Sequence, residues 1–153
     1  MTIEDDIAFL ERVPTLGLLG RDALRILAIG AESRYLHDGN VLFVQGEPAD
    51  AGYVVQEGLL ILDPSRGRDP ITVGPGTLLG ELAMLTETTR PVTATALEPS
   101  TVIRIPRTLF LKMLEGYPEA ALRLRDSFVT RAEHSESEMH RVRRVLEPNH
   151  GQT

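Results

Sequence analysis

One stretch decides the fold of this 153-residue chain: Gly80-Glu81-Leu82-Ala83-Met84-Leu85-Thr86-Glu87-Thr88-Thr89-Arg90, followed by Pro91 and the alternating run Val92-Thr93-Ala94-Thr95-Ala96. A glycine turn opens a very short helix, Glu81 stands at its start, and Arg90 follows nine residues later. Backbone N–H groups at a helix N-terminus attract an anion, a guanidinium offers paired donors to phosphate oxygens, and a carboxylate accepts from a ribose hydroxyl. The stretch therefore contains the parts that hold a small molecule with a phosphate and a sugar hydroxyl.

This segment resembles the phosphate-binding cassette of cyclic nucleotide-binding domains, the family of catabolite activator protein, protein kinase A regulatory subunits and cyclic-nucleotide-gated channels. The family pattern is Gly-Glu-Leu-Ala, a short spacer, and then Arg-Ala or Arg-Ser/Thr before a β-strand. The first four residues of the stretch and Arg90 are in register with it. The resemblance implies a cassette at residues 80–91 whose ligand-binding residues are Gly80, Glu81, Leu82, Ala83, Arg90, Pro91 and Val92.

Three further blocks extend the resemblance to roughly residues 10–145. Residues 36–50 resemble a family strand and its Glu-Gly-Asp-Pro-type turn, residues 53–58 the Tyr-Ile-Val-x-x-Gly strand, and residues 74–81 the approach to the cassette. Four ordered blocks are more specific than the cassette alone. They imply a mainly β fold, a jelly-roll-like β-roll (double-stranded β-helix) with N-terminal helices and a long C-terminal helix.

Length and composition predict a single domain over residues 1–153. Within it, the resemblance and the residue pattern imply N-terminal helices at 1–31, the β-roll at 32–106 and C-terminal helices at 107–147. The net charge of −6 argues against direct nucleic acid binding, because phosphate neutralisation requires clustered Lys and Arg. No apolar run approaches a membrane span, and the acidic N-terminus is unlike a signal peptide. Cysteine is absent. A cytoplasmic protein without membrane attachment is expected.

The residue pattern predicts helices at the ends of the chain and strands in the middle. Helices are predicted at residues 3–12, 21–29 and 107–114. The inward faces of the first two are Ile3, Ile7 and Leu10, and Leu24, Leu27 and Ala28. Between residue 32 and about residue 105, turn residues separate short runs of β-formers. These runs predict strands at residues 41–44, 53–55, 59–62, 92–96 and 101–105, with Val92, Ala94 and Ala96 inward.

A long helix is predicted from Pro118 to Glu147. Its apolar or small residues are spaced 4-3-4-3-4, which is the pattern of a coiled-coil seam. The seam positions are Phe128, Ala132, Ser135, Met139, Val142 and Leu146. The expected outcome is a homodimer formed through this helix, as in catabolite-activator-like proteins, and the alternative is that the stripe packs on its own domain.

Sites for catalysis or a metal are not predicted. The four histidines, at positions 37, 134, 140 and 150, have no Glu or Cys partners at metal-ligand spacing. The chain has no Gly-x-Ser-x-Gly elbow and no nucleotide-triphosphate loop with its lysine. We therefore expect a protein that is not an enzyme and that uses neither metal nor cofactor.

The cassette departs from the family pattern at Pro91. The family commonly has Ala, Ser or Thr here, whose backbone N–H, in some cases together with a side-chain hydroxyl, reaches the phosphate, and proline has neither donor. The sequence predicts a regulatory sensor for cyclic AMP (cAMP) or cyclic GMP (cGMP), without deciding between them, that acts on an effector protein of unknown identity. Two alternatives stay open: a degenerate, dimeric interaction module that binds no cyclic nucleotide, and the sensor part of a Crp/Fnr-like transcription regulator without its DNA-binding domain.

Overall fold

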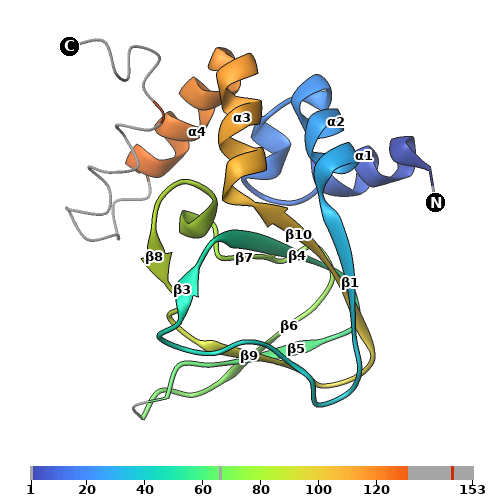
Figure 1. The fold of residues 1–153 in the computed structure, drawn as a ribbon, viewed down its shortest axis with the longest axis vertical. Coiled ribbons are helices and arrows are strands. Elements are labelled where there is room, and N and C mark those ends of the chain that lie inside the picture. The colour runs from blue at the N-terminus through green and yellow to red at the C-terminus, as the bar shows by residue number, and fades with distance from the viewer. Residues whose placement is uncertain (1, 66, 131–145, 147–153) are drawn as a thin grey trace. The chain divides into compact units, whose positions relative to one another are not determined.

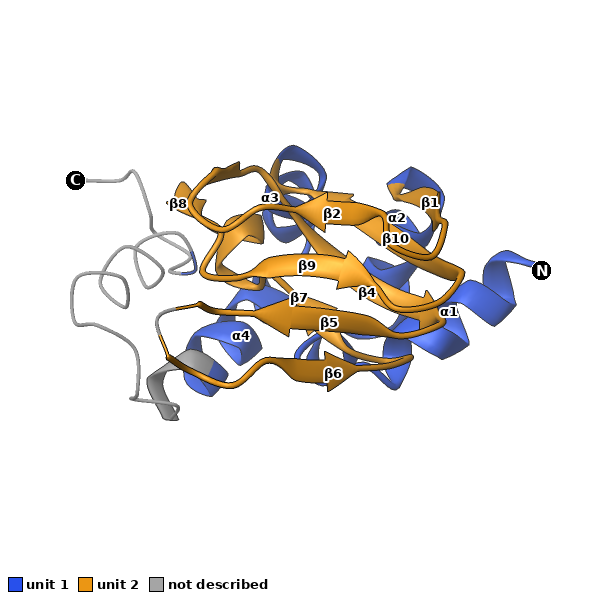
Figure 2. Cartoon of the chain, turned by 90° about the horizontal axis from the view of Figure 1, so that it is seen from below, with its two compact units in different colours: residues 1–30, 108–153 blue, residues 31–107 orange. Residues whose placement is uncertain are grey.

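The structure is a computed structural model that describes residues 2–65, 67–130 and 146. The chain divides into two compact units (Figure 2). Unit 1 consists of Met1–Gly30 and Thr108–Thr153, and unit 2 is the continuous segment Ala31–Arg107. Within the described residues, no helix combines the length and apolarity needed to cross a membrane.

Unit 2 is the predicted β-roll, and its described strands pair antiparallel throughout. One four-stranded sheet has the order β1 (Glu32–Leu36), β10 (Ser100–Pro106), β4 (Ala51–Glu57), β7 (Leu78–Leu79). The other has the order β2 (Val41–Phe43), β9 (Thr93–Ala96), β5 (Leu60–Asp63), β6 (Ile71–Val73). A short two-stranded sheet joins β3 (Pro48–Ala49) to β8 (Thr88–Thr89). Figure 1 shows these strands winding around a common interior, so the prediction of a mainly β roll with flanking helices is confirmed.

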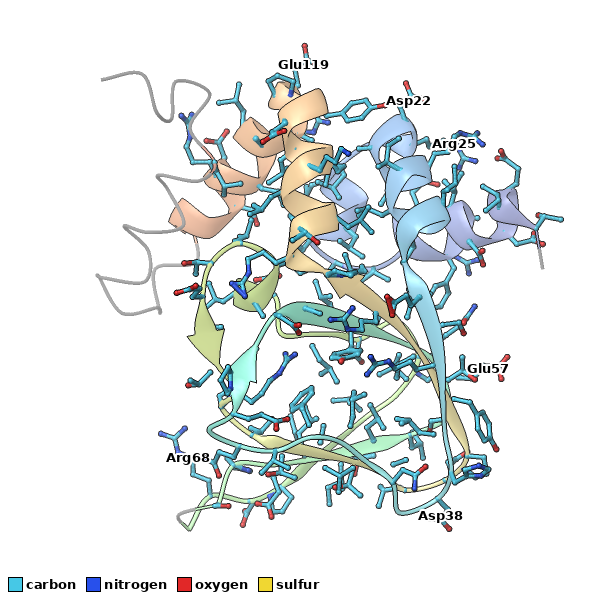
Figure 3. All side chains as sticks on the ribbon, in the orientation of Figure 1. Asp22, Arg25, Asp38, Glu57, Arg68 and Glu119 are labelled. Atoms are coloured by element: carbon cyan, nitrogen blue, oxygen red, sulfur yellow. The ribbon has the colours of Figure 1, made fainter. Side chains whose placement is uncertain are left out.

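Side chains from both four-stranded sheets fill the interior of the roll (Figure 3). The register of β5 and β9 places Leu60 opposite Ala96 and Leu62 opposite Ala94, so that apolar residues meet on one face. Successive residues of a strand point to opposite faces, and Thr93 and Thr95 accordingly lie on the other side. The inward orientation predicted for residues 92, 94 and 96 is confirmed.

Unit 1 contains the helices α1 (Ile3–Glu11), α2 (Arg21–Gly30), α3 (Arg107–Gly116), whose first residue belongs to unit 2, and α4 (Pro118–Thr130), with a short 3-10 turn η1 (Leu16–Leu18). Thr2 and Asp5 form a capping box that starts α1. The inward face of α1 is Ile7 and Leu10, whereas Ile3 is 38% exposed because it occupies the solvent-facing first turn, so its predicted burial is wrong.

In α2, Leu24 and Leu27 are buried as predicted. Ala23, rather than the half-buried Ala28, completes the buried face. The stripe is therefore centred nearer to the start of the helix than its periodicity indicated. Ion pairs from Arg21 to Glu4 (3.0 Å) and to Glu11 (2.9 Å) join α2 to α1.

Of the helix predicted from Pro118 to Glu147, the structure describes α4 over Pro118–Thr130. Of the predicted seam, Ala132, Ser135, Met139 and Val142 lie outside the described residues. Phe128 belongs to α4, and Leu146 is buried, with none of its surface exposed. The seam and the homodimer stay predictions.

Candidate functional site

The cassette begins with a turn that favours glycine. Gly80 follows β7 directly and has φ = 76°, in the left-handed region that favours glycine. A Cβ atom on this residue would lie 2.5 Å from Nη1 of Arg90 and 3.2 Å from the carbonyl oxygen of Ala51. The glycine therefore allows the backbone to approach the Arg90 guanidinium closely.

The very short helix predicted after Gly80 is the 3-10 turn η2 (Leu82–Met84). The amide of Ala83 donates to the Gly80 carbonyl (3.0 Å) and the amide of Met84 to the Glu81 carbonyl (3.3 Å). These two N–H groups are therefore already used within the turn. The Ala83 side chain is buried, and Glu81 and Leu82 are half-buried.

Arg90 is held by its backbone at the end of the β3–β8 pair. Its N–H donates to the carbonyl of Glu47 (2.9 Å), and its carbonyl accepts from the N–H of Gly46 (2.8 Å). These two hydrogen bonds continue the antiparallel pairing of Pro48 with Thr89. The backbone position of Arg90 is thus set by a turn that is distant in the sequence.

The side chain of Arg90 is only 4% exposed, which is unusual for an arginine. Its guanidinium carbon lies 4.3 Å from the ring centre of Phe43 and 5.4 Å from that of Tyr53. Nη1 is buried without a hydrogen-bond partner, and no described carboxylate forms a salt bridge with this side chain. A buried donor that is left unpaired is costly, so the site is suited to an anion that would satisfy it.

Desolvation lowers the pKa of the Arg90 guanidinium, and the field of Tyr53, Asp50 and Glu47 acts in the opposite direction. Arginine stays protonated in proteins, so a permanent positive charge remains inside the roll. Of those acidic neighbours, Asp50 is engaged with Arg104 at 3.1 Å.

The last two predicted site residues, Pro91 and Val92, differ in their burial. Pro91 is exposed. Val92 packs partly against the core of the roll. The structure thus brings Gly80 and Arg90 together at the start and the end of the cassette. Sequence reasoning did not single out Phe43 and Tyr53 as neighbours of Arg90, because each reads only as an inward residue of a strand.

A groove of about 500 Å³ runs along β3 and β8, and its charged lining residues are Asp50, Glu87 and Arg107. It does not include Gly80, Glu81 or Arg90. Arg107 is anchored there because its Nη2 donates to the Ala49 carbonyl (2.9 Å). We place the candidate site at Arg90 rather than in the groove, because Arg90 combines burial, charge and an unpaired donor.

Among the described residues, no group of acidic and histidine side chains is arranged to hold a metal ion.

Comparisons with known proteins agree with the fold. The family model for the cyclic nucleotide-binding domain matches residues 33–117. A cyclic nucleotide-binding-like protein from Brucella abortus is similar in structure, with a TM-score of 0.64 and 40% identity over 72% of this chain and 98% of that one. The N-terminal domain of a transcriptional regulator from Streptomyces coelicolor has a TM-score of 0.72 and 29% identity over 80% of this chain and 89% of that one.

The curated relatives are longer proteins. Lysophospholipase NTE1 of Coccidioides immitis is 33% identical over 63% of this chain, which spans 6% of that protein. An uncharacterized NTE family protein of Mycobacterium bovis is 31% identical over 71% of this chain and 19% of its own length. This chain therefore corresponds to a small part of the curated relatives that it matches.

Proposed function

Because this chain belongs to the cyclic nucleotide-binding domain family, we propose that it is a non-enzymatic regulatory module whose β-roll binds a cyclic nucleotide, cAMP or cGMP. The domain fold is a regulatory one. The cyclic phosphate would pair with Arg90 beside Gly80. Ligand binding would then alter the interaction of this domain with an effector protein.

The observation that carries the proposal is the unpaired, buried Nη1 of Arg90. A cyclic nucleotide carries a phosphodiester with one negative charge and two unesterified oxygens, which suits a single buried cation. Hydrogen bonds to a charged group contribute about 1.5–3 kcal/mol each. Since Gly80 has no side chain, none stands between its backbone and Nη1.

Two cassette residues refine the proposal. The carboxylate of Glu81, at the start of η2, is the acceptor proposed for the ribose 2′-hydroxyl. Pro91 supplies no N–H to the phosphate. We therefore expect weaker affinity than a cassette with a donor at this position would have.

The test is calorimetric titration of the wild type, Arg90→Gln and Arg68→Gln with cAMP and with cGMP. Arg68 is exposed and projects from the loop between β5 and β6 (Figure 3), and either substitution removes one positive charge. We expect Arg90→Gln to lose measurable binding and Arg68→Gln to retain it. Equal affinity of the wild type and Arg90→Gln would overturn the proposal, because the phosphate would then not depend on Arg90.

A second candidate is an interaction module that binds no cyclic nucleotide. Pro91 favours it, since the cassette lacks a donor of the family pattern. If the folded protein gives no heat of binding with either nucleotide in the calorimetric titration, this second candidate is favoured. A sensor part of a Crp/Fnr-like regulator is a further candidate, favoured by the similarity to the domain from Streptomyces coelicolor.

The curated relatives suggest what the effector could be. Since relatives include proteins named as lysophospholipases, we propose a lipid hydrolase as one candidate effector, either joined to this domain or bound by it. The test is lysophospholipase activity of the Coccidioides immitis relative in the presence of this chain, with and without cyclic nucleotide. No change in activity would reject this effector.

A further inference from the structure

Within the described residues, Arg90 is buried without the carboxylate partner that a buried arginine usually has. A buried arginine is ordinarily balanced by a carboxylate, because an isolated ion pays a large desolvation penalty. In the described part of the chain Arg90 has no such partner. Instead, its guanidinium lies within cation–π distance of Phe43 at 4.3 Å and of Tyr53 at 5.4 Å.

The two kinds of contact use different parts of the guanidinium. An aromatic ring attracts the cation through the face of the ring and leaves the N–H groups unoccupied. A carboxylate would take those N–H groups, usually two at once, and would compete with an incoming phosphate. Aromatic neighbours therefore stabilise the charge and keep the donor Nη1 free.

We propose that Phe43 and Tyr53 are positioning residues that hold the Arg90 guanidinium on their rings with Nη1 directed to Gly80, ready for the phosphate of the ligand. This inference rests on the proposed function, because it assigns a role in the same site. Phe43 is the principal contact, since its ring is the nearer of the two.

Tyr53 is itself fixed from outside the site. Its hydroxyl accepts a hydrogen bond from Nη1 of Arg34 on β1 (3.4 Å), and its ring is 6.0 Å from the Phe43 ring. The ring is almost fully buried on β4. The two aromatic residues thus form one surface, which β2 and β4 hold from opposite sheets of the roll.

The first experiment compares the affinity of Phe43→Leu, Phe43→Tyr and Phe110→Leu for cAMP and cGMP by calorimetry. Leucine keeps an apolar side chain but removes the ring, and tyrosine keeps the ring. Phe110→Leu makes the same change at a buried residue of α3, which belongs to unit 1, whereas Arg90 belongs to unit 2. We expect Phe43→Leu to bind about 5- to 30-fold more weakly than the wild type, with Phe43→Tyr and Phe110→Leu near the wild type. Equal affinities of Phe43→Leu and Phe110→Leu would overturn the inference.

The second experiment needs no ligand. In the NMR spectrum of the free protein, the Nε–H signal of Arg90 should be shifted upfield by the ring currents, and Arg90→Gln identifies the signal by its loss. The shift should disappear in Phe43→Leu and persist in Phe43→Tyr. If the wild type binds neither nucleotide, the proposed function fails and these spectra alone decide whether the rings hold Arg90. An Arg90 signal without an upfield shift would overturn the inference even if binding is measured.

Discussion

Replacing Gly80 by alanine tests the close approach between the cassette turn and the buried arginine. The new Cβ would lie 2.5 Å from Nη1 of Arg90, and a residue with a side chain would have to adopt φ = 76°. Gly76→Ala is the matched control, because Gly76 also has a positive φ, 89°, but has nothing within 4 Å of the added Cβ.

The two substitutions share one energetic cost and differ in another. A left-handed conformation costs an alanine roughly 1–2 kcal/mol, and the control should lose only this amount. In Gly80→Ala the guanidinium must also leave its position over Phe43, a contact worth about 2 kcal/mol when desolvated. We therefore expect Gly80→Ala to be less stable than Gly76→Ala by about 2 kcal/mol, which corresponds to about 4–8 °C in Tm for a chain of this size.

The assay is thermal unfolding followed by circular dichroism, combined with titration of both variants with cyclic nucleotide. Gly76→Ala should bind as the wild type does, and Gly80→Ala should not bind measurably, because the Cβ would displace the Arg90 guanidinium from its place beside residue 80. Equal Tm values and equal affinities for the two variants would refute the reasoning, since Arg90 would then not lie against Gly80.

Two further predictions follow from the cassette and from the C-terminal segment. Pro91→Ala restores an N–H at the start of the strand and should tighten cyclic nucleotide binding by up to about 10- to 100-fold, against a chain-entropy cost of at most about 1 kcal/mol; unchanged or weaker binding in calorimetry would mean that the proline belongs to a differently shaped site. Met139→Glu changes a predicted seam position outside the described residues. It should convert a dimer into a monomer in sedimentation experiments while the β-roll stays folded, because it places a carboxylate in the apolar seam. A dimer unaffected by this change would rule out the seam.

The predictable part of the fold depends on local patterns. The alternation at residues 92–96 identified the inward face of β9, because a strand has a fixed period of two. The strands predicted at 53–55 and 101–105 are the middles of β4 and β10. The strands β1, β3, β6, β7 and β8 were not predicted. Three of them, β3, β7 and β8, have only two residues each and exist through their hydrogen-bonded partners.

The candidate site was also predictable from the sequence only in part. Gly80 and Arg90 could be predicted as site residues because a glycine turn and an arginine at a set spacing have a recognisable pattern.

Helical periodicity correctly predicted the burial of Ile7 and Leu10, but it wrongly predicted the burial of Ile3. Periodicity does not indicate where along its length a helix stops contacting the surface that it covers.

The sequence by itself determined the class of fold, the position of the cassette and the presence of one arginine in it, because turns, strand periods and motif spacing are properties of neighbouring residues. Only the tertiary structure decided how that arginine is held. Phe43 and Tyr53 come from strands in opposite sheets and meet Arg90 only when the roll closes. Closure removes water from the guanidinium and leaves Nη1 without a partner. Burial and pairing are properties of the packed interior, and no spacing along the chain specifies them.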